Sequence, residues 1–329
     1  MSTAIFDSLP GMETAVSDVA RTLAAVWDME AAPGKAAPSE FRASQMNLVV
    51  HLGLDNTPGT ARAAFDTALR FSHRYPCRTI VLCPRDFGGP ADVRAKVFCE
   101  CFVGTSHHEM VCSEAIILSY PLEQRAYIEN QASIMIESDL PLYYWPNRIR
   151  IAARFGDYPF LLSKSQRIVL DSSIERPEVP AYAWPRPELV YDLAYARTLS
   201  LRQSLGHFLS YVQPAQLVEG LRAVTLHHGP AVAGEARAAA AWMRSRLDDC
   251  AAVAGCAPLE AEFVLQEAGP SGALDFRLAY ADGGSIRLAF DLTHGAACLH
   301  ARLPQANASM SSTVHLLPDD RALAEALFF

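Results

Sequence analysis

The segment from residue 46 to residue 83 constrains the fold of this chain most. Residues 46–52 form an apolar run that predicts a buried strand, and residues 78–83, stopped by Pro84, predict a second one. Between them, Thr57 and Pro58 supply a helix N-cap and a first helical position. The expected inward face of this helix carries Ala61, Ala64, Phe65, Ala68 and Leu69. A crossover of this length allows parallel strands, so the segment predicts the nucleus of an α/β domain.

The following residues extend this nucleus into a mixed sheet. Residues 96–103 alternate between two faces, and residues 110–118 return after a short loop, which predicts an antiparallel hairpin. A helix over residues 121–136 leads to a strand at residues 140–145, and residues 167–171 supply the last strand. We therefore expect a mixed-sheet α/β domain over residues 45–173.

A proline-rich segment separates this domain from the rest of the chain. Four prolines, at positions 177, 180, 185 and 187, are incompatible with a helix interior or a central strand, so residues 174–188 are predicted to be a linker. Beyond it, residues 189–329 are predicted to form an α+β domain. The expected helices are 189–209, 214–223, 231–253 and 319–327, and the expected strands are 262–267, 275–280, 285–291 and 297–303.

Residues 1–44 are expected to form an amphipathic helix and a connector. Apolar positions at helical spacing follow one stripe over residues 12–29, namely Val16, Val19, Ala20, Leu23, Val26 and Trp27. The stretch 31–44 is rich in Ala, Pro, Gly and Ser. It could let the helix dock on its own domain or on a partner.

Composition limits the classes of partner. The chain has 329 residues, half of them hydrophobic and 19% charged, with a formal net charge of −8. No cluster of Lys and Arg points to nucleic acid or to an anionic membrane surface. No secretory start and no run of ~20 apolar residues is present, which predicts a cytoplasmic protein. The eight cysteines lack the spacing of a disulfide framework, so reduced thiols are expected.

The cysteines near position 100 are candidate redox thiols. Cys99, Cys101 and Cys112, with His107 and His108 nearby, have the residue types that zinc prefers, but Cys99 and Cys101 share a strand face with Val97 and Val103 and are expected to be packed. Neighbouring positions on one strand face are ~6.5 to 7 Å apart, at or past the limit for a disulfide. A cross-strand pair of Cys112 with Cys99 or Cys101 is more plausible than a pair within the strand. We predict no metal site.

No motif for catalysis or cofactor binding is found in the sequence. A glycine-rich phosphate loop, a nucleophile elbow, a zinc-binding His-Glu-x-x-His helix and an EF-hand loop are all absent. We therefore expect no catalytic residue and no cofactor. Asp139 and Asp171 lie at strand boundaries, where a polar crevice for a sugar phosphate could form. The competing interpretation, which we favour, is that both aspartates cap turns or end strands.

An aromatic and arginine-rich stretch is the candidate interface with a partner. Tyr, Trp and Arg dominate binding hot spots. They occur here as Tyr143, Tyr144, Trp145, Arg148, Arg150 and Arg154. At least one of the two tyrosines should nevertheless face the core, because successive strand residues point to opposite sides. Tyr182 and Trp184, in the proline-rich segment, are a second candidate.

Several of these segments also carry a family resemblance. The pattern consists of Asn47-Leu-Val-Val50, a segment from His73 to Leu82, residues 111–118, and Asp139-Leu-Pro followed by Trp145 and, further on, Asp171-Ser172. It is similar to the OpcA family of bacterial assembly and allosteric-effector proteins of glucose-6-phosphate dehydrogenase. The residues that carry the resemblance are Pro76, Arg78, Cys112, Glu114, Asp139, Leu140, Pro141, Trp145, Asp171 and Ser172. The spacing from His73 to Arg78 departs from the family pattern, so no role is carried over to His73.

The resemblance implies a function that composition and spacing do not reach. It implies a non-catalytic protein that binds oligomeric glucose-6-phosphate dehydrogenase and promotes its assembly or allosteric activation in the oxidative pentose phosphate pathway. The alternative is a sugar-phosphate-binding sensor or enzyme of the same pathway that uses a crevice near Asp139 and Asp171.

Overall fold

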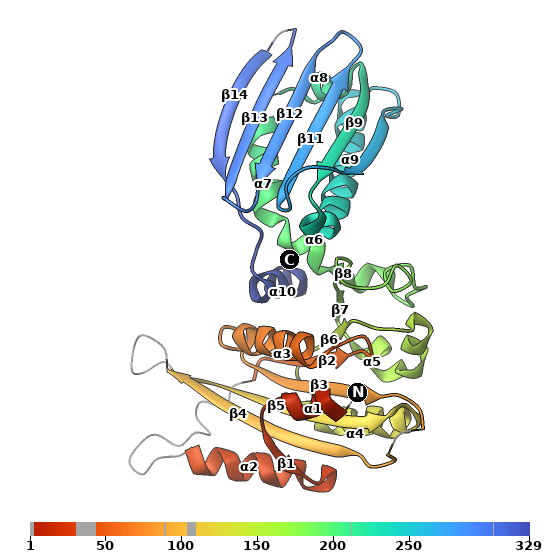
Figure 1. Ribbon diagram of the computed structural model, residues 1–329, viewed down its shortest axis with the longest axis vertical. Coiled ribbons are helices and arrows are strands. Elements are labelled where there is room, and N and C mark those ends of the chain that lie inside the picture. The colour runs from red at the N-terminus through yellow and green to blue at the C-terminus, as the bar shows by residue number, and fades with distance from the viewer. Residues whose placement is uncertain (1–2, 31–43, 89, 104–109, 211, 305) are drawn as a thin grey trace. The chain divides into compact units, whose positions relative to one another are not determined.

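The chain divides into two units, each with its own sheet (Figure 1). The computed structural model describes residues 3–30, 44–88, 90–103, 110–210, 212–304 and 306–329. Unit 1 comprises Met1–Asp192 together with Asp319–Phe329, and unit 2 comprises Leu193–Pro318. Both units combine helices with strands, so the predicted mixed α/β class is confirmed.

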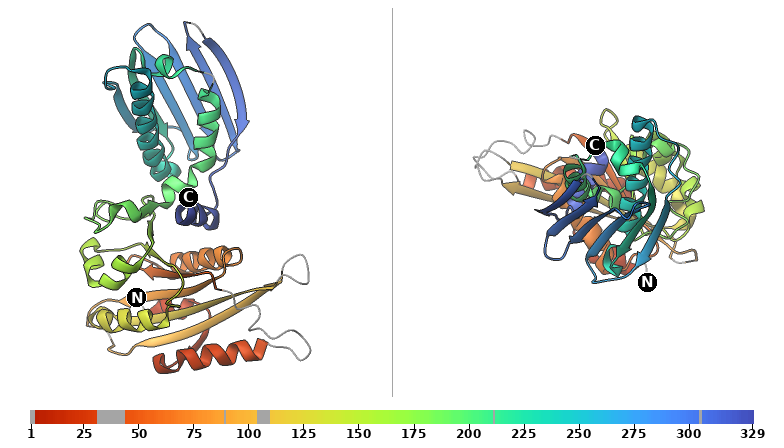
Figure 2. Two further views of the ribbon diagram at one scale, coloured as in Figure 1. Left: turned by 180° about the vertical axis from the view of Figure 1, so that it is seen from behind. Right: turned by 90° about the horizontal axis from the view of Figure 1, so that it is seen from above.

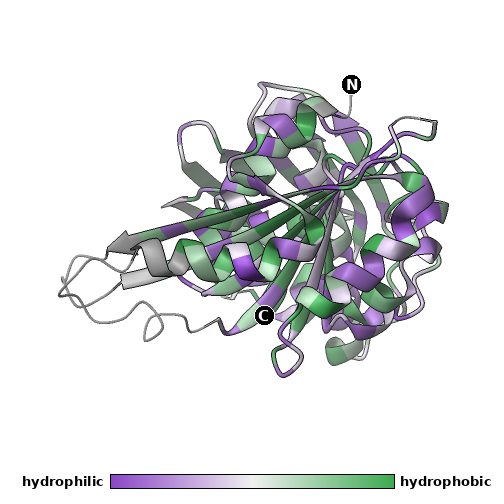
Figure 3. Cartoon of the chain, turned by 90° about the horizontal axis from the view of Figure 1, so that it is seen from below, coloured by the Kyte–Doolittle hydropathy of each residue, from purple (hydrophilic) through white to green (hydrophobic). Residues whose placement is uncertain are grey.

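Unit 1 is built on an eight-stranded sheet in the order β1-β4-β5-β3-β2-β6-β7-β8. Its strands are β1 Met12–Thr14, β2 Met46–Leu52, β3 Cys77–Arg85, β4 Arg94–Val103, β5 Met110–Pro121, β6 Leu142–Asn147, β7 Arg167–Leu170 and β8 Val190–Asp192. The run from β5 to β8 is parallel, while β4 and β1 are antiparallel to their neighbours. Every residue of β2, β3 and β6 is buried, as expected of parallel strands covered on both faces. Figure 3 shows that hydrophobic residues predominate in the strands at the centre of that view.

Helices cover both faces of this sheet. The main ones are α1 Thr3–Ser8, α2 Val19–Glu30, α3 Pro58–Ser72, α4 Arg125–Met135, α5 Pro159–Lys164 and α10 Asp319–Phe328. Helices α1 and α10 pack against α3 on one face, and α2 and α4 share a groove on the other. Helix α3 starts as predicted, because the Thr57 side chain accepts a hydrogen bond from the Thr60 backbone N–H and the Thr60 side chain bonds back.

The N-terminal segment differs from its prediction. The expected helix over residues 12–29 starts only at Val19, because Met12–Thr14 instead forms an edge strand against β4. The short helix α1 was not predicted, and it is held by Lys96, whose Nζ donates to the carbonyls of Phe6 and Leu9 at 2.8 and 2.9 Å. A pairing between residues 12–14 and 95–97 leaves no local pattern by which a sequence could reveal it.

Strand β3 runs through Pro84, where its end was predicted. The pairing of β3 with β2 stops at His51 and Leu82, whereas its pairing with β5 continues to Arg85. Pro84 therefore lies beyond the end of β2 and has a neighbour on one side only. At such an edge-like position the missing N–H costs no ladder bond.

The proline-rich segment and the last helix both belong to unit 1, which differs from the predicted domain limits. Val179 and Trp184, expected in a linker, are buried, and the Trp184 ring lies 4.6 Å from that of Phe155. The chain passes to unit 2 after Asp192. Helix α10, expected to close the C-terminal domain, instead places Phe328 against Phe71 of α3.

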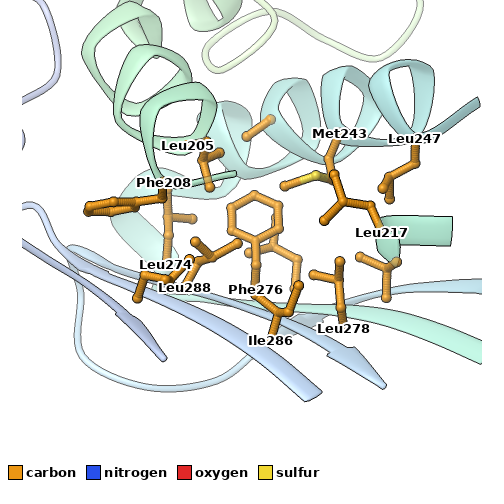
Figure 4. Packing of buried hydrophobic residues seen from close by; sticks show 14 of the residues in the cluster. Leu205, Phe208, Leu217, Met243, Leu247, Leu274, Phe276, Leu278, Ile286 and Leu288 are labelled. Carbon is orange, nitrogen blue, oxygen red and sulfur yellow. The ribbon is translucent and has the colours of Figure 1, made fainter. Parts of the chain in front are cut away.

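Unit 2 is a six-stranded sheet in the order β10-β9-β11-β12-β13-β14, with its main helices on one face (Figure 2). Its strands are β9 Leu221–His228, β10 Glu262–Glu267, β11 Ala273–Tyr280, β12 Ser285–Asp291, β13 Ala296–Leu303 and β14 Ala306–Thr313. Its helices are α6 Leu193–Arg197, α7 Leu199–Leu209, α8 Pro214–Val218 and α9 Ala233–Ala254. The inner face of the sheet packs Phe276 and Leu288 against Leu205 and Met243 (Figure 4).

Three further strands were not predicted, namely β8 at the end of unit 1 and β9 and β14 in unit 2. The expected helix 214–223 ends at Val218, and β9 begins three residues later, after Gly220 with a φ of 69°. The expected helix 189–209 is divided into β8, α6 and α7. Strand β14, made of small polar residues, carries no hydrophobic alternation that would have predicted it.

Candidate functional site

The candidate site of unit 1 lies where its parallel strands end. From β2 the chain moves to β3 and β5 on one side, and then crosses over to β6 on the other side. The strand order thus reverses between β2 and β6, and ligands of open α/β sheets bind outside the carboxyl ends at such a point. The loops after β2 and β6 touch directly. The Gly53 N–H donates to the Asn147 carbonyl at 2.8 Å.

Glycine is required at position 53 by this close approach. An ideal Cβ on Gly53 would lie 2.3 Å from the Arg148 carbonyl oxygen and 2.7 Å from the Ile149 Cα atom. Arg148 itself has a φ of 54°, the left-handed conformation that few residues other than glycine adopt. The two loops therefore fit together only with a bare backbone at Gly53.

A carboxylate of the chain itself occupies the backbone donors at this point. The N–H groups of Arg148 and Ile149 both donate to Glu175, the second at 2.9 Å. Successive N–H groups beside a left-handed residue form an anion-binding nest. Burial raises the pKa of Glu175 to about 7 even though both hydrogen bonds lower it. The position that could hold a ligand anion is thus filled internally.

A buried histidine and three tyrosines lie beside the crevice. His51 Nδ1 is 2.7 Å from the Tyr144 hydroxyl, and the Tyr120 and Tyr158 hydroxyls are 2.7 Å apart. Burial lowers the pKa of His51 to about 3, and burial raises the pKa of Tyr158 to about 12. Burial also raises the pKa of Tyr120 and of Tyr144. All four groups are therefore neutral near pH 7 and are poorly matched to general acid–base catalysis.

A small apolar cavity of about 40 Å³ opens at the same strand ends. The side chains of Leu54, Leu122, Ile149 and Ile151 supply much of its lining, and His51 and Tyr158 also line it. The sequence did not predict His51 as a site residue, because a histidine inside an apolar strand carries no motif.

The charges at the crevice are paired with one another. Arg150 donates to Asp55 at 2.8 Å, to Asp86 at 3.3 Å and to the Leu54 carbonyl at 2.8 Å. Arg176 also bonds Asp55, at 2.5 Å. Burial raises the pKa of Asp55, but its bonds with Arg176 and Arg150 lower it, and the net direction is downward. Asp55 therefore stays charged and keeps both guanidinium groups in place.

The aromatic part of the predicted interface is not at the surface. Tyr143, Tyr144 and Trp145 are at most 7% exposed, because β6 lies between β2 and β7 with both faces covered. A partner could reach them only by opening the core, so this part of the prediction is wrong. Arg150 and Arg154 do lie at the surface, with side chains 40% and 39% exposed.

The predicted crevice between Asp139 and Asp171 does not form. Asp139 precedes β6, whereas Asp171 follows β7, and these two strands are parallel. The two carboxylates therefore lie at opposite ends of these neighbouring strands, separated by about one strand length, ~20 Å. Asp171 accepts hydrogen bonds from the Ser173 N–H and hydroxyl at 3.1 and 2.6 Å, which is a turn-forming use.

The remaining motif residues hold the fold together. Arg78 pairs with the buried Glu114 at 2.5 Å and with Glu137 at 2.6 Å. The carbonyls of Pro76 and Pro141 accept backbone N–H groups of the chain around β2. Leu140 offers its carbonyl to the Asn47 side chain at 3.3 Å, and the Ser172 hydroxyl bonds Asp192 at 2.5 Å. None of these contacts forms a reaction centre.

Among the candidate thiols, Cys101 and Cys112 form a cross-strand disulfide, with an S–S distance of 2.07 Å. The expectation of reduced thiols is wrong for this pair, because β4 and β5 place the two residues directly opposite each other, whereas Cys99 lies opposite Glu114. His107 and His108 lie outside the described residues. In the part of the chain that the structure describes, no three metal-ligating side chains come together.

Unit 1 is thus a doubly wound α/β domain with a crevice at which Glu175, Arg150 and Arg154 are all bonded within the chain. Among the described residues, no helix is long and apolar enough to span a membrane. Residues 68–183, from the end of α3 through β7, match the family model described as the glucose-6-phosphate dehydrogenase subunit N-terminal domain. This match over residues 68–183 supports the resemblance to the OpcA family of glucose-6-phosphate dehydrogenase assembly proteins that the sequence motifs indicated.

No curated protein matches the chain. Similar solved structures include KijD10, a 3-ketoreductase from Actinomadura kijaniata in complex with NADP and TDP-benzene, at 8% identity and a TM-score of 0.40, covering 85% of this chain and 87% of that one. A mutant of the same enzyme gives 8% identity and a TM-score of 0.34, covering 85% and 88%. At these TM-scores the likeness carries no argument about function.

Proposed function

We propose that this chain is a non-catalytic partner of glucose-6-phosphate dehydrogenase in the bacterial cytoplasm, where it promotes assembly or allosteric activation of that enzyme in the oxidative pentose phosphate pathway. The observation that carries the proposal is the family match over residues 68–183, which spans most of the sheet of unit 1. A role in assembly of the dehydrogenase follows from the family, and binding and activation by this chain are our extension of it.

The chemistry of the crevice supports a role without catalysis. His51, the histidine nearest the switch point, is buried and neutral near pH 7, and Glu175 accepts two backbone hydrogen bonds. A general base needs a free lone pair and a pKa near the working pH. The pKa of His51 lies far below that range, and Glu175, whose pKa burial raises to about 7, does not line the cavity, so the crevice gives little support to proton transfer.

A partner of this kind acts by binding one state of the enzyme more tightly than another. Preference for the active conformation or oligomer shifts the population by the difference in binding free energy, typically ~1 to 3 kcal/mol, or about 5- to 150-fold. The expected kinetic effect is a lower KM for glucose 6-phosphate or a higher kcat.

The test is a measurement of dehydrogenase velocity against glucose 6-phosphate concentration, with the enzyme from the same organism and with or without this chain. A heat-unfolded sample of the chain serves as the control, and co-elution on a sizing column reports binding. Co-elution together with a kinetic change would support the proposal. If the folded chain neither co-elutes with the enzyme nor changes its kinetics, the proposal is wrong.

A further inference from the structure

We infer, on the basis of the proposed function, that the cavity at the carboxyl ends of β2, β3 and β6, together with Phe87 and Ile151 beside it, is the surface that docks on the dehydrogenase. The cavity receives one uncharged, apolar side chain of that enzyme. We call this surface the docking face. It includes Arg150 and Arg154 of the interface predicted from the sequence, but not the aromatic residues of that prediction, which are buried.

The size of the cavity favours a side chain over a free metabolite. Pockets that bind small molecules usually measure ~300 to 1,000 Å³ and bury most of the ligand. This cavity measures about 40 Å³, which is room for a small group of atoms. An inserted side chain fits this volume, because the rest of its protein would lie outside on the rim.

Exposed apolar side chains next to the cavity extend the docking face. Phe87, directly beyond β3, is 49% exposed, and Ile151, which lines the cavity, is 45% exposed. The guanidinium group of Arg154 lies 5.1 Å from the centre of the Phe87 ring. Large apolar groups around a pocket, with arginine among them, are typical of interface hot spots.

The charges around the cavity indicate an uncharged partner group. Arg150 is bonded to Asp55 and Asp86, and Arg154 is bonded to Asp157 at 3.1 Å. Both guanidinium groups thus already have carboxylate partners, so a charged group entering the cavity would lose its hydration without meeting an uncompensated charge. An apolar group leaves them intact as a polar ring around the contact, the arrangement that excludes water from hot spots.

The test compares two double variants of the full chain. The docking-face variant carries Phe87→Ser and Ile151→Ser, and the matched control carries Tyr127→Ser and Ile134→Ser. The control removes the same kinds of exposed side chain from α4 of the same unit, where Tyr127 and Ile134 are 47% and 76% exposed. Calorimetric titration with the dehydrogenase gives Kd, and thermal melting checks that both variants are folded. We expect the docking-face variant to bind about 10-fold more weakly or worse, and the control to match the wild type.

The outcomes separate the inference from the proposed function. If the wild type and both variants bind equally, the docking face is wrong while the proposed function stands. If the wild type binds and the control loses as much affinity as the docking-face variant, the inference is also wrong. If the wild type forms dimers alone that the docking-face variant abolishes, a second copy is the occupant and the inference fails. If the folded wild type does not bind the enzyme, both proposals fail together.

Discussion

Replacing Gly53 by alanine tests whether the two loops at the switch point must touch through bare backbone. The added Cβ would lie 2.3 Å from the Arg148 carbonyl oxygen, whereas ordinary contacts begin at 3.4 Å. Both groups belong to the backbone, so neither can rotate away. The loops must separate by about an ångström, the difference between these two distances, or the backbone must distort.

The cost can be worked from the contacts on either side. Separation weakens the hydrogen bonds from Gly53 N–H to Asn147 O at 2.8 Å and from Asp55 N–H to Arg148 O at 3.3 Å. Each is worth about 1 kcal/mol, and overpacking adds about 1 to 3 kcal/mol. Alanine offsets about 0.4 to 1 kcal/mol of this loss, because it lowers the conformational entropy of the unfolded chain. The free energy of unfolding should therefore fall by about 3 kcal/mol.

Scanning calorimetry measures this loss, with Gly59→Ala as the matched control. A Cβ on Gly59 meets only the Thr57 Oγ1 atom, at 3.9 Å, and the position lies in α3, where alanine is favoured. For a unit of this size, about 1 kcal/mol corresponds to about 2 to 4 °C in Tm. Gly53→Ala should melt about 6 to 12 °C lower, and Gly59→Ala should not melt lower. Two equal melting temperatures would refute the close-approach argument.

Three further predictions concern polar groups of unit 1. Arg78→Met leaves the carboxylate of Glu114 buried without its closest cation, so urea unfolding should show a free energy of unfolding lower by about 3 to 5 kcal/mol. Adding Glu114→Gln to this variant should recover part of the lost stability. If the losses of the two single variants simply add in the double variant, the two side chains do not form a buried pair. The pKa of Glu175 is raised from 4.5 to about 7 in the folded chain, so its contribution to stability is present below pH 4.5 and is lost as the pH rises towards 7. Glu175→Gln should therefore flatten the fall in stability between pH 4.5 and 7, and an unchanged slope would show that this carboxyl is not the source. Thiol titration of the unfolded, unreduced chain should find six of the eight cysteines, because Cys101 and Cys112 are joined; eight thiols would show that the pair is reduced.

The elements that could be predicted from the sequence are those whose signals are local. The prediction for β2 agrees with the structure because its apolar run ends at a turn, and α3 starts at its predicted cap. Strands β10 and β12 also have their predicted limits, because turn residues flank alternating patterns. In each case the residues that decide the structure lie within a few positions of the element.

Elements that depend on distant partners were missed. Strand β1 exists because it pairs with residues 95–97, and β14 exists because β13 presents an unpaired edge. The site was affected in the same way. Tyr143 and Trp145 have the composition of an interface, and only the placement of β6 between two other strands shows that they are core. Likewise, nothing near Glu175 in the sequence indicates that it reaches the backbone of Arg148.

The crevice of unit 1 can be understood from what its polar groups already bind. In an open α/β sheet this position normally offers backbone donors and charged side chains to a ligand. Here Glu175 takes the backbone donors and Asp55 takes Arg150, so most of the polar atoms need no ligand. A face with satisfied polar groups can be covered by another protein without leaving unpaired charges behind, whereas a catalytic site requires groups that are free to react. The pairing of these groups within the chain is therefore consistent with the proposed role as a binding partner.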